Sequence, residues 1–185
     1  MSERKPEIQS IEVLAFTRQS SSLAGECPLT ELPRLAAGLY QMDPGAQATW
    51  QLEGHQQAVL GGDAEVWLHL QGQTDVVLQC QRCLQGVTTA LAVDRRFRFV
   101  RTEAEAARLD EESEDDVLVL QQRLDVLELL EDELILSLPI VPRHEVCPAP
   151  LRLVDPEDEL LDDAAPHPFA ALAALRGRKP PEGDS

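Results

Sequence analysis

The chain has 185 residues, enough for one domain with a substantial hydrophobic core, and it carries a formal net charge of -17 at pH 7. So acidic a chain is not expected to coat nucleic-acid phosphates over a broad surface, because that binding depends on Lys and Arg; a basic partner is the simpler electrostatic expectation. Aromatic residues make up only 4% of the sequence, so we expect a core of Leu, Val, Ile and Ala and neither an aromatic ligand pocket nor a base-stacking surface.

The sequence carries no pattern typical of export or membrane insertion. Residues 1–6 are polar and are followed by no apolar segment of the length that a signal peptide needs. The longest apolar region, 126–141, is interrupted by acidic side chains. We therefore expect a cytoplasmic protein without a membrane partner. Thiols stay reduced in the cytoplasm, so a disulfide framework is not expected among the four cysteines, Cys27, Cys80, Cys83 and Cys147.

The first fifty residues predict a strand, a short helix and a second strand. The stretch 7–16 is strand-like, and the serines at 20–22 indicate a loop or a poorly paired edge. After Thr30, apolar residues recur at three- and four-residue spacing, which predicts a short helix with one buried stripe: Leu32, Leu35, Ala36 and Leu39. Residues 43–45 (Asp-Pro-Gly) predict a turn, and 48–52 predict the next strand.

The middle of the chain predicts successive antiparallel strands. Apolar and polar residues alternate over 64–71, which is typical of a half-buried strand. Gly72 indicates a turn, and 74–80 and 87–99 predict two more strands. The connections between these segments are too short for the crossover that parallel strands need.

The following residues predict a loop, a strand and the longest helix. The stretch 103–116 is so acidic that we expect a solvated, mobile loop, and 117–120 predicts a strand. Asp125 is a candidate N-cap for a helix over 126–138, which Pro139 ends. On this helix the consecutive acids at 131–133 are expected to form a polar face rather than a general acid/base pair, because neighbouring helical residues point in different directions.

Together these elements predict an α+β fold. We expect a mainly antiparallel sheet, able to curve toward a barrel, with a short N-terminal helix and one longer helix near 126–138. Residues 1–150 would form this single domain, and 151–185 an acidic, largely flexible tail. The tail would end in a short amphipathic helix at 168–176 that docks on a partner through Phe169, Leu172 and Leu175.

Two short motifs contain candidate metal ligands. Cys80 and Cys83 form C-x-x-C, and His144 and Cys147 form H-x-x-C. Three thiolates and one imidazole have the number and type of ligands of a closed tetrahedral zinc site. The other interpretation is that reduced thiols lie partly buried beside a strand turn, with His144 exposed. A redox pair is a third interpretation, although a reactive C-x-x-C normally lies at a helix N-terminus and strands flank this one.

A cluster of arginines is a candidate RNA-binding surface. Four of them follow the C-x-x-C motif and could contact phosphates: Arg95, Arg96, Arg98 and Arg101. Phe97 and Phe99 alternate with them. The competing interpretation is that the phenylalanines are core residues and the arginines are the solvated face of the same strand.

Three short sequence motifs, taken together and in this order, are more informative about the family of the chain than its pattern of apolar residues. They are Cys-Gln-Arg-Cys at 80–83, Glu-Asp-Glu-Leu-Ile-Leu-Ser-Leu-Pro-Ile-Val-Pro at 131–142, and Pro-Phe-Ala-Ala-Leu-Ala-Ala-Leu at 168–175. With His144 and Cys147 after the second stretch, this combination resembles the YceD family, the large ribosomal RNA subunit accumulation proteins of bacteria. The resemblance covers roughly residues 10–179.

The resemblance implies a non-enzymatic role in ribosome biogenesis. It implies support for the synthesis, processing or stability of 23S ribosomal RNA, with that RNA or a pre-ribosomal protein as partner and no small-molecule substrate. Members of the family carry cysteine pairs at both places, whereas this chain has His144 and Cys147 at the second. That departure leaves zinc binding open, because His can replace Cys as a ligand.

Two other classes of function stay open at this point. The first is a zinc-stabilised adaptor that binds protein and makes no direct RNA contact. The second is a thiol oxidoreductase, which would require a depressed thiolate pKa at Cys80 or Cys83.

Overall fold

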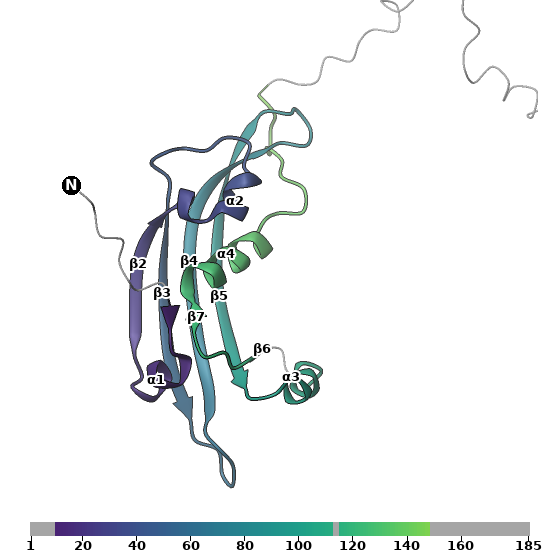
Figure 1. Ribbon diagram of the computed structural model, residues 1–185. Helices are drawn as coiled ribbons and strands as arrows, with labels where there is room; N and C mark the ends of the chain where they lie inside the picture. Colours follow the sequence, from purple (N-terminus) through teal and green to yellow (C-terminus); the bar gives the residue numbers. More distant parts are fainter. Residues whose placement is uncertain (1–9, 113–114, 149–185) are drawn as a thin grey trace, which may run out of the picture. The chain divides into compact units, whose positions relative to one another are not determined.

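The computed structural model describes residues 10–112 and 115–148, which form an α+β fold built on an open sheet (Figure 1). The order of the five strands is β2-β3-β4-β5-β6, and the sheet is antiparallel except for the last pair, β5 with β6. The predicted fold class is confirmed, whereas the curvature toward a barrel is not, because β2 and β6 remain separate edges. The strands are β2 (Ser22–Pro28), β3 (Gln47–Gln57), β4 (Glu65–Gln79), β5 (Gly86–Val100) and β6 (Asp116–Val119).

Helices cover one face of this sheet. Three of them, α1 (Val13–Arg18), α2 (Pro33–Ala37) and α4 (Val126–Leu136), lie on the same side in Figure 1, and α3 (Glu103–Asp110) follows the end of β5. A 3-10 turn at Leu29–Glu31 leads into α2. A second, two-stranded sheet joins β1 (Ser10–Ile11) to β7 (Leu124–Asp125), just before α4.

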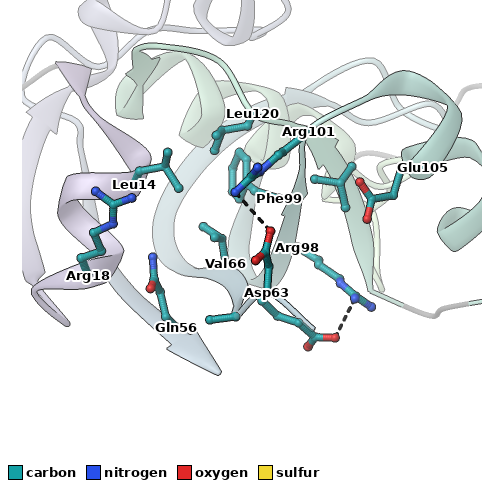
Figure 2. A pocket seen from close by; sticks show the side chains of 13 residues that line it. Leu14, Arg18, Gln56, Asp63, Val66, Arg98, Phe99, Arg101, Glu105 and Leu120 are labelled. Atoms are coloured by element: carbon teal, nitrogen blue, oxygen red, sulfur yellow. Dashed lines mark ion pairs between the residues drawn. The ribbon is translucent and has the colours of Figure 1, made fainter. Parts of the chain in front are cut away.

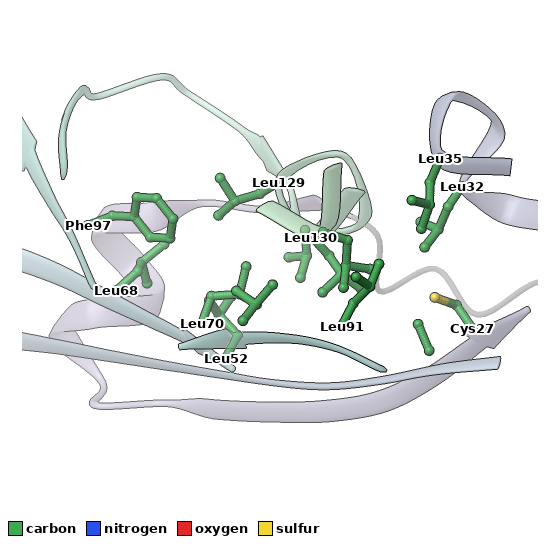
Figure 3. Close-up of a cluster of buried hydrophobic side chains, with 14 of the residues drawn as sticks. Cys27, Leu32, Leu35, Leu52, Leu68, Leu70, Leu91, Phe97, Leu129 and Leu130 are labelled. Carbon is green, nitrogen blue, oxygen red and sulfur yellow. The ribbon is translucent and has the colours of Figure 1, made fainter. Parts of the chain in front are cut away.

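The core lies between the helices and the covered face of the sheet (Figure 3). Strand residues point alternately to the two faces, so every second residue of β4 from Val66 to Leu78 is buried, except the half-buried Gly72. Leu52, Leu68 and Leu70 of the sheet and Leu130 of α4 are fully buried. The core is aliphatic, as the composition predicts, with Phe97 as its largest fully buried side chain.

The two central strands form one long hairpin. Each of β4 and β5 has 15 residues, and they pair without interruption from Val66 with Phe99 to Gln79 with Gly86. The prediction of a turn at Gly72 is therefore wrong. Gly72 lies inside β4, where the packing of α4 leaves no room for a side chain, because a Cβ there would lie 2.6 Å from Cδ1 of Leu130.

Two segments differ from their sequence prediction because short helices bury residues at helical spacing. In the predicted strand 7–16, the described part contains only β1 and then α1, in which Val13 and Thr17 are buried four residues apart. In the predicted acidic loop 103–116, α3 begins at the Thr102 cap and buries Ala106 and Leu109. Its acidic side chains stay outside, so composition alone conceals the helix.

Helix α4 is confirmed, two residues shorter than predicted. Its N-cap is Asp125, whose carboxylate accepts hydrogen bonds from the backbone N–H groups of Leu127 (2.9 Å) and Glu128 (3.1 Å). The helix ends at Leu136, and Ser137 is its C-cap. The chain then continues to Pro148 without helix or strand.

The prediction of a polar face at 131–133 is wrong for two of the three acids. Glu131 is 4% and Glu133 8% exposed. Oε1 of Glu131 accepts hydrogen bonds from the backbone N–H groups of Arg34 (2.6 Å) and Leu35 (3.1 Å), and Oε2 accepts one from Nε of Arg34 (2.9 Å). These N–H groups belong to the first turn of α2, whose own N-cap residue supplies no side-chain hydrogen bond. Glu131 thus caps a helix far away in the sequence.

The predicted tail at 151–185, with its helix at 168–176 and the docking residues Phe169, Leu172 and Leu175, lies outside the described residues. Within the part of the chain that the structure describes, none of the helices has the length and apolar character needed to cross a membrane.

Candidate metal centre

The C-x-x-C motif forms the turn between β4 and β5. This turn is closed by hydrogen bonds from the backbone N–H of Cys80 to the carbonyl of Gln85 and from the N–H of Leu84 to the carbonyl of Cys80, both 2.8 Å. Leu84 has φ of 62°, in the left-handed region that costs a residue with a side chain some strain. The tight reversal turns both cysteines toward the same side of the hairpin end.

The H-x-x-C motif lies in the segment that follows α4, and this segment brings it to the β4–β5 turn. After α4 the segment 137–148 runs to the end of the sheet where β4 meets β5 (Figure 1). The backbone N–H of Gln81 donates a hydrogen bond of 2.9 Å to the carbonyl of Pro142, which aligns the two segments. Two motifs whose nearest ligands, Cys83 and His144, are 61 residues apart in the chain are thereby held side by side, as the metal hypothesis requires.

The structure brings all four predicted ligands together. One donor atom from each of Cys80, Cys83, His144 and Cys147 lies within 4.8 Å of every other. Sγ of Cys80 is 4.0 Å from Sγ of Cys147, and Sγ of Cys83 is 3.4 Å from Nδ1 of His144. Cys80 is fully buried and the other three side chains are half-buried.

The imidazole of His144 is oriented by a backbone carbonyl. Its Nε2 lies 3.1 Å from the carbonyl oxygen of Gly86, the first residue of β5. Because a carbonyl oxygen only accepts hydrogen bonds, Nε2 carries the hydrogen. In the neutral ring the lone pair is then on Nδ1, the nitrogen that faces Cys83. The exposed His144 of the alternative interpretation is therefore not what the structure shows.

Burial and hydrogen bonds act on the cluster thiols in different directions. Burial of Cys80 disfavours its thiolate and raises its pKa. Backbone N–H groups from both motifs nevertheless donate to its sulfur, from His144, Cys83 and Arg82, and they lower the pKa of Cys80 to about 5. Burial raises the pKa of Cys147, and the sulfurs of its neighbours raise it further. The cluster therefore stabilises a thiolate at Cys80.

A low thiolate pKa also suits redox chemistry, but the sulfur of Cys80 is too buried for a reaction partner to reach it. Thiol exchange requires that a second thiol or disulfide reach the attacking sulfur, and Cys80 is 0% exposed. The fourth cysteine is separate: Cys27 lies in β2, 3% exposed, and burial raises its pKa to about 11. The arrangement suits a sulfur that binds a metal better than one that exchanges disulfides.

The four candidate RNA-binding arginines do not share one face. Arg96 and Arg98 alternate with the buried Phe97 and Phe99 and point to the open side of the sheet, while Arg95 points toward α4. Arg101 follows the end of β5. Each is within ion-pair distance of a carboxylate: Arg95 with Glu133 (3.3 Å), Arg96 with Asp115 (3.1 Å), Arg98 with Glu65 (2.6 Å) and Arg101 with Asp63 (3.3 Å). RNA binding by these residues stays a prediction.

A hollow of about 290 Å³ lies beside two of these ion pairs (Figure 2). It adjoins α1 and the ends of β4 and β5, away from the cysteines. Three arginines and three acids line it: Arg18, Arg98, Arg101, Asp63, Glu65 and Glu105. Their formal charges cancel, so the hollow offers no net attraction to a phosphate.

Sequence reasoning missed the backbone groups that complete the cluster. The carbonyl of Gly86 and the N–H groups directed at Cys80 carry no sequence pattern of their own. The position of Gly86, three residues after Cys83 at the start of a strand, is the only indication that a carbonyl is available there.

The comparisons with known proteins agree with the resemblance. The family model described as large ribosomal RNA subunit accumulation protein YceD matches residues 68–176, which include both cluster motifs and α4. A Haemophilus influenzae protein with the same description is 28% identical over 172 residues, covering 90% of this chain and 94% of its own. No solved structure matches the chain. Since the family model matches more than half of its residues, this chain belongs to the YceD family.

Proposed function

We propose that this chain is a ribosome-biogenesis factor that supports the synthesis, processing or stability of 23S ribosomal RNA in the cytoplasm. The observation that carries the proposal is the match to a family described by large ribosomal RNA subunit accumulation, over residues that contain the cluster and α4. The Haemophilus influenzae relative, which carries that description, matches along almost its whole length, so the likeness is not confined to one motif.

We infer a binding role rather than an enzymatic one. The buried acids that would be the first candidates for acid/base work are engaged in structure: Glu131 caps α2, and Glu133 pairs with Arg95. The hollow beside β5 is balanced in charge by its own ion pairs. These contacts support a factor that acts by holding a partner.

The charge distribution favours contact with the assembling ribosome through a basic protein. The chain has a formal net charge of -17, and its central arginines face carboxylates of its own. A phosphate would have to displace those carboxylates to bind the arginines, whereas a basic protein meets an attractive acidic surface. Large-subunit RNA is the other partner that the proposal allows.

The test is a strain lacking the chain, complemented by plasmid-borne variants. We expect the ratio of 23S to 16S ribosomal RNA to fall in the deletion strain and to recover with the wild-type chain. An unchanged ratio in the deletion strain would contradict the proposal. Crosslinking in the complemented strain, with identification of RNA and protein, then separates direct RNA contact from contact through a ribosomal protein.

A matched pair of variants tests the arginines. Arg96→Gln with Arg101→Gln removes two exposed charges from the predicted RNA surface, and Arg108→Gln with Arg123→Gln removes two exposed charges elsewhere. If the two double variants crosslink to RNA equally and with equal salt dependence, the surface that contains Arg96 and Arg101 is not the RNA contact.

A further inference from the structure

We propose that Cys80, Cys83, His144 and Cys147 bind one Zn²⁺ in a closed, structural site that fastens the segment 137–148 to the β4–β5 turn. This inference does not depend on the proposed function, because it rests on the geometry of the four side chains.

The donor separations fit a single tetrahedral ion. Bonds of about 2.3 Å to sulfur and about 2.0 Å to nitrogen place two sulfurs about 3.8 Å apart and a sulfur and a nitrogen about 3.5 Å apart. The corresponding separations here are 4.0 Å between Cys80 and Cys147 and 3.4 Å between Cys83 and His144. The widest of the separations, at most 4.8 Å, closes with small side-chain rotations.

The donor set selects the metal and its role. Three sulfurs and one imidazole nitrogen at tetrahedral separations suit Zn²⁺, whereas Mg²⁺ and Ca²⁺ require oxygen ligands. Four protein ligands leave no open position for water or substrate, so the site is structural. The bond from His144 Nε2 to the Gly86 carbonyl supplies the outer contact that zinc-bound imidazoles regularly make, and it directs Nδ1 at the other donors.

The segment that carries His144 and Cys147 has little else to hold it. It contains no helix or strand, and after Leu138, which packs against the core, its apolar side chains are largely exposed: Ile140 is 99% and Val146 85% exposed. Apart from the hydrogen bonds that His144 makes to the sulfur of Cys80 and the carbonyl of Gly86, its described backbone contact with the turn is the hydrogen bond from Gln81 to Pro142. A metal bound at its end would supply the attachment that burial does not.

A disulfide is the competing use of these thiols. The sulfurs of Cys80 and Cys147 are 4.0 Å apart, and a bond requires about 2.05 Å. Such a bond would leave Cys83 and the oriented imidazole of His144 without a role, whereas zinc uses all four groups. The experiment below distinguishes the two.

The first measurement is the metal content of the full-length chain, purified without an affinity tag under reducing conditions. We expect about one zinc per chain by mass spectrometry, falling to below about one-tenth in Cys83→Ser and His144→Ala. Cys27→Ala is the matched control: it removes a buried cysteine outside the cluster and is expected to keep its zinc. Equal zinc in the wild type and both cluster variants would overturn the proposal.

The second measurement uses Co²⁺ alone as a probe on the reduced, metal-free wild-type chain. We expect the visible bands of tetrahedral cobalt and thiolate charge-transfer absorption, and His144→Cys should retain binding with stronger charge-transfer absorption. A wild-type chain that shows neither after reduction, whether or not it forms a Cys80–Cys147 disulfide in air, overturns the proposal. This measurement holds even where a variant fails to fold.

The structural role has its own readout. Arg143 is exposed and lies next to His144, so trypsin reports local opening there. Adding a chelator should speed cleavage after Arg143 at least about tenfold and leave cleavage after Arg108, in α3, unchanged. Equal rates after Arg143 with and without metal would contradict the fastening role.

Discussion

Replacing Glu131 should destabilise the fold more than its position on a short helix suggests. Its carboxylate is nearly buried and accepts the two N–H groups that begin α2, at 2.6 and 3.1 Å. Hydrogen bonds to a charged acceptor contribute about 1.5 to 3 kcal/mol each, and in Glu131→Ala both donors lose their partner inside the protein. Allowing for water that enters beside α2, we expect a loss of about 3 kcal/mol.

Urea unfolding followed by circular dichroism measures this loss. For a slope of about 2 kcal/mol/M, a change of about 3 kcal/mol lowers the midpoint by about 1.5 M. Glu131→Gln keeps one acceptor oxygen but directs an N–H₂ group at the Arg34 guanidinium, so its midpoint should fall between those of the wild type and Glu131→Ala.

Asp132→Asn is the control for this experiment. Asp132 accepts a hydrogen bond only at the exposed end of Arg34, so its replacement should shift the midpoint much less. A midpoint for Glu131→Ala equal to that of Asp132→Asn would refute the assignment of Glu131 as the cap of α2.

Three further predictions follow from the packing of α4. Gly72→Ala places a methyl group against Leu130 and should cost about 1 to 3 kcal/mol by overpacking; an unchanged melting temperature would contradict the close approach. Asp125→Ala removes the N-cap and should cost about 1 kcal/mol in urea unfolding, whereas Asp125→Asn should recover most of it. Burial raises the pKa of Glu133 even though Arg95 opposes the shift. The folded state then binds the Glu133 proton more tightly, so lowering the pH from 7 toward its unfolded pKa should stabilise the wild type more than Glu133→Gln; parallel pH curves would contradict this.

The sequence predicts those parts of the structure that depend on local pattern. Alternation of apolar and polar residues identifies β5, and Asp125 followed by a stripe of apolar residues at helical spacing identifies α4. Each of these patterns is local, so neither requires knowledge of a distant contact. The four cluster residues are predicted because metal ligands must be of a few chemical types, and only two short motifs offer them.

The parts that depend on distant contacts could not be predicted in the same way. Gly72 resembles a turn residue until Leu130 is known to pack against it. Glu131 resembles a solvated acid until α2 is placed over it, although its position four residues after Leu127 and three before Leu134 puts it on the apolar side of α4. The carbonyl that orients His144 belongs to the backbone and has no residue type to identify it.

The long hairpin separates two regions that a small ligand could not join. A strand of 15 residues at about 3.3 Å per residue spans roughly 45 to 50 Å, with the cysteine turn at one end and the ion pairs of Arg98 and Arg101 near the other. Substitutions at the two ends share no contacts, so their effects on stability should add. A partner that touched both would have to be macromolecular, and variants at the two ends would report on its two contacts separately.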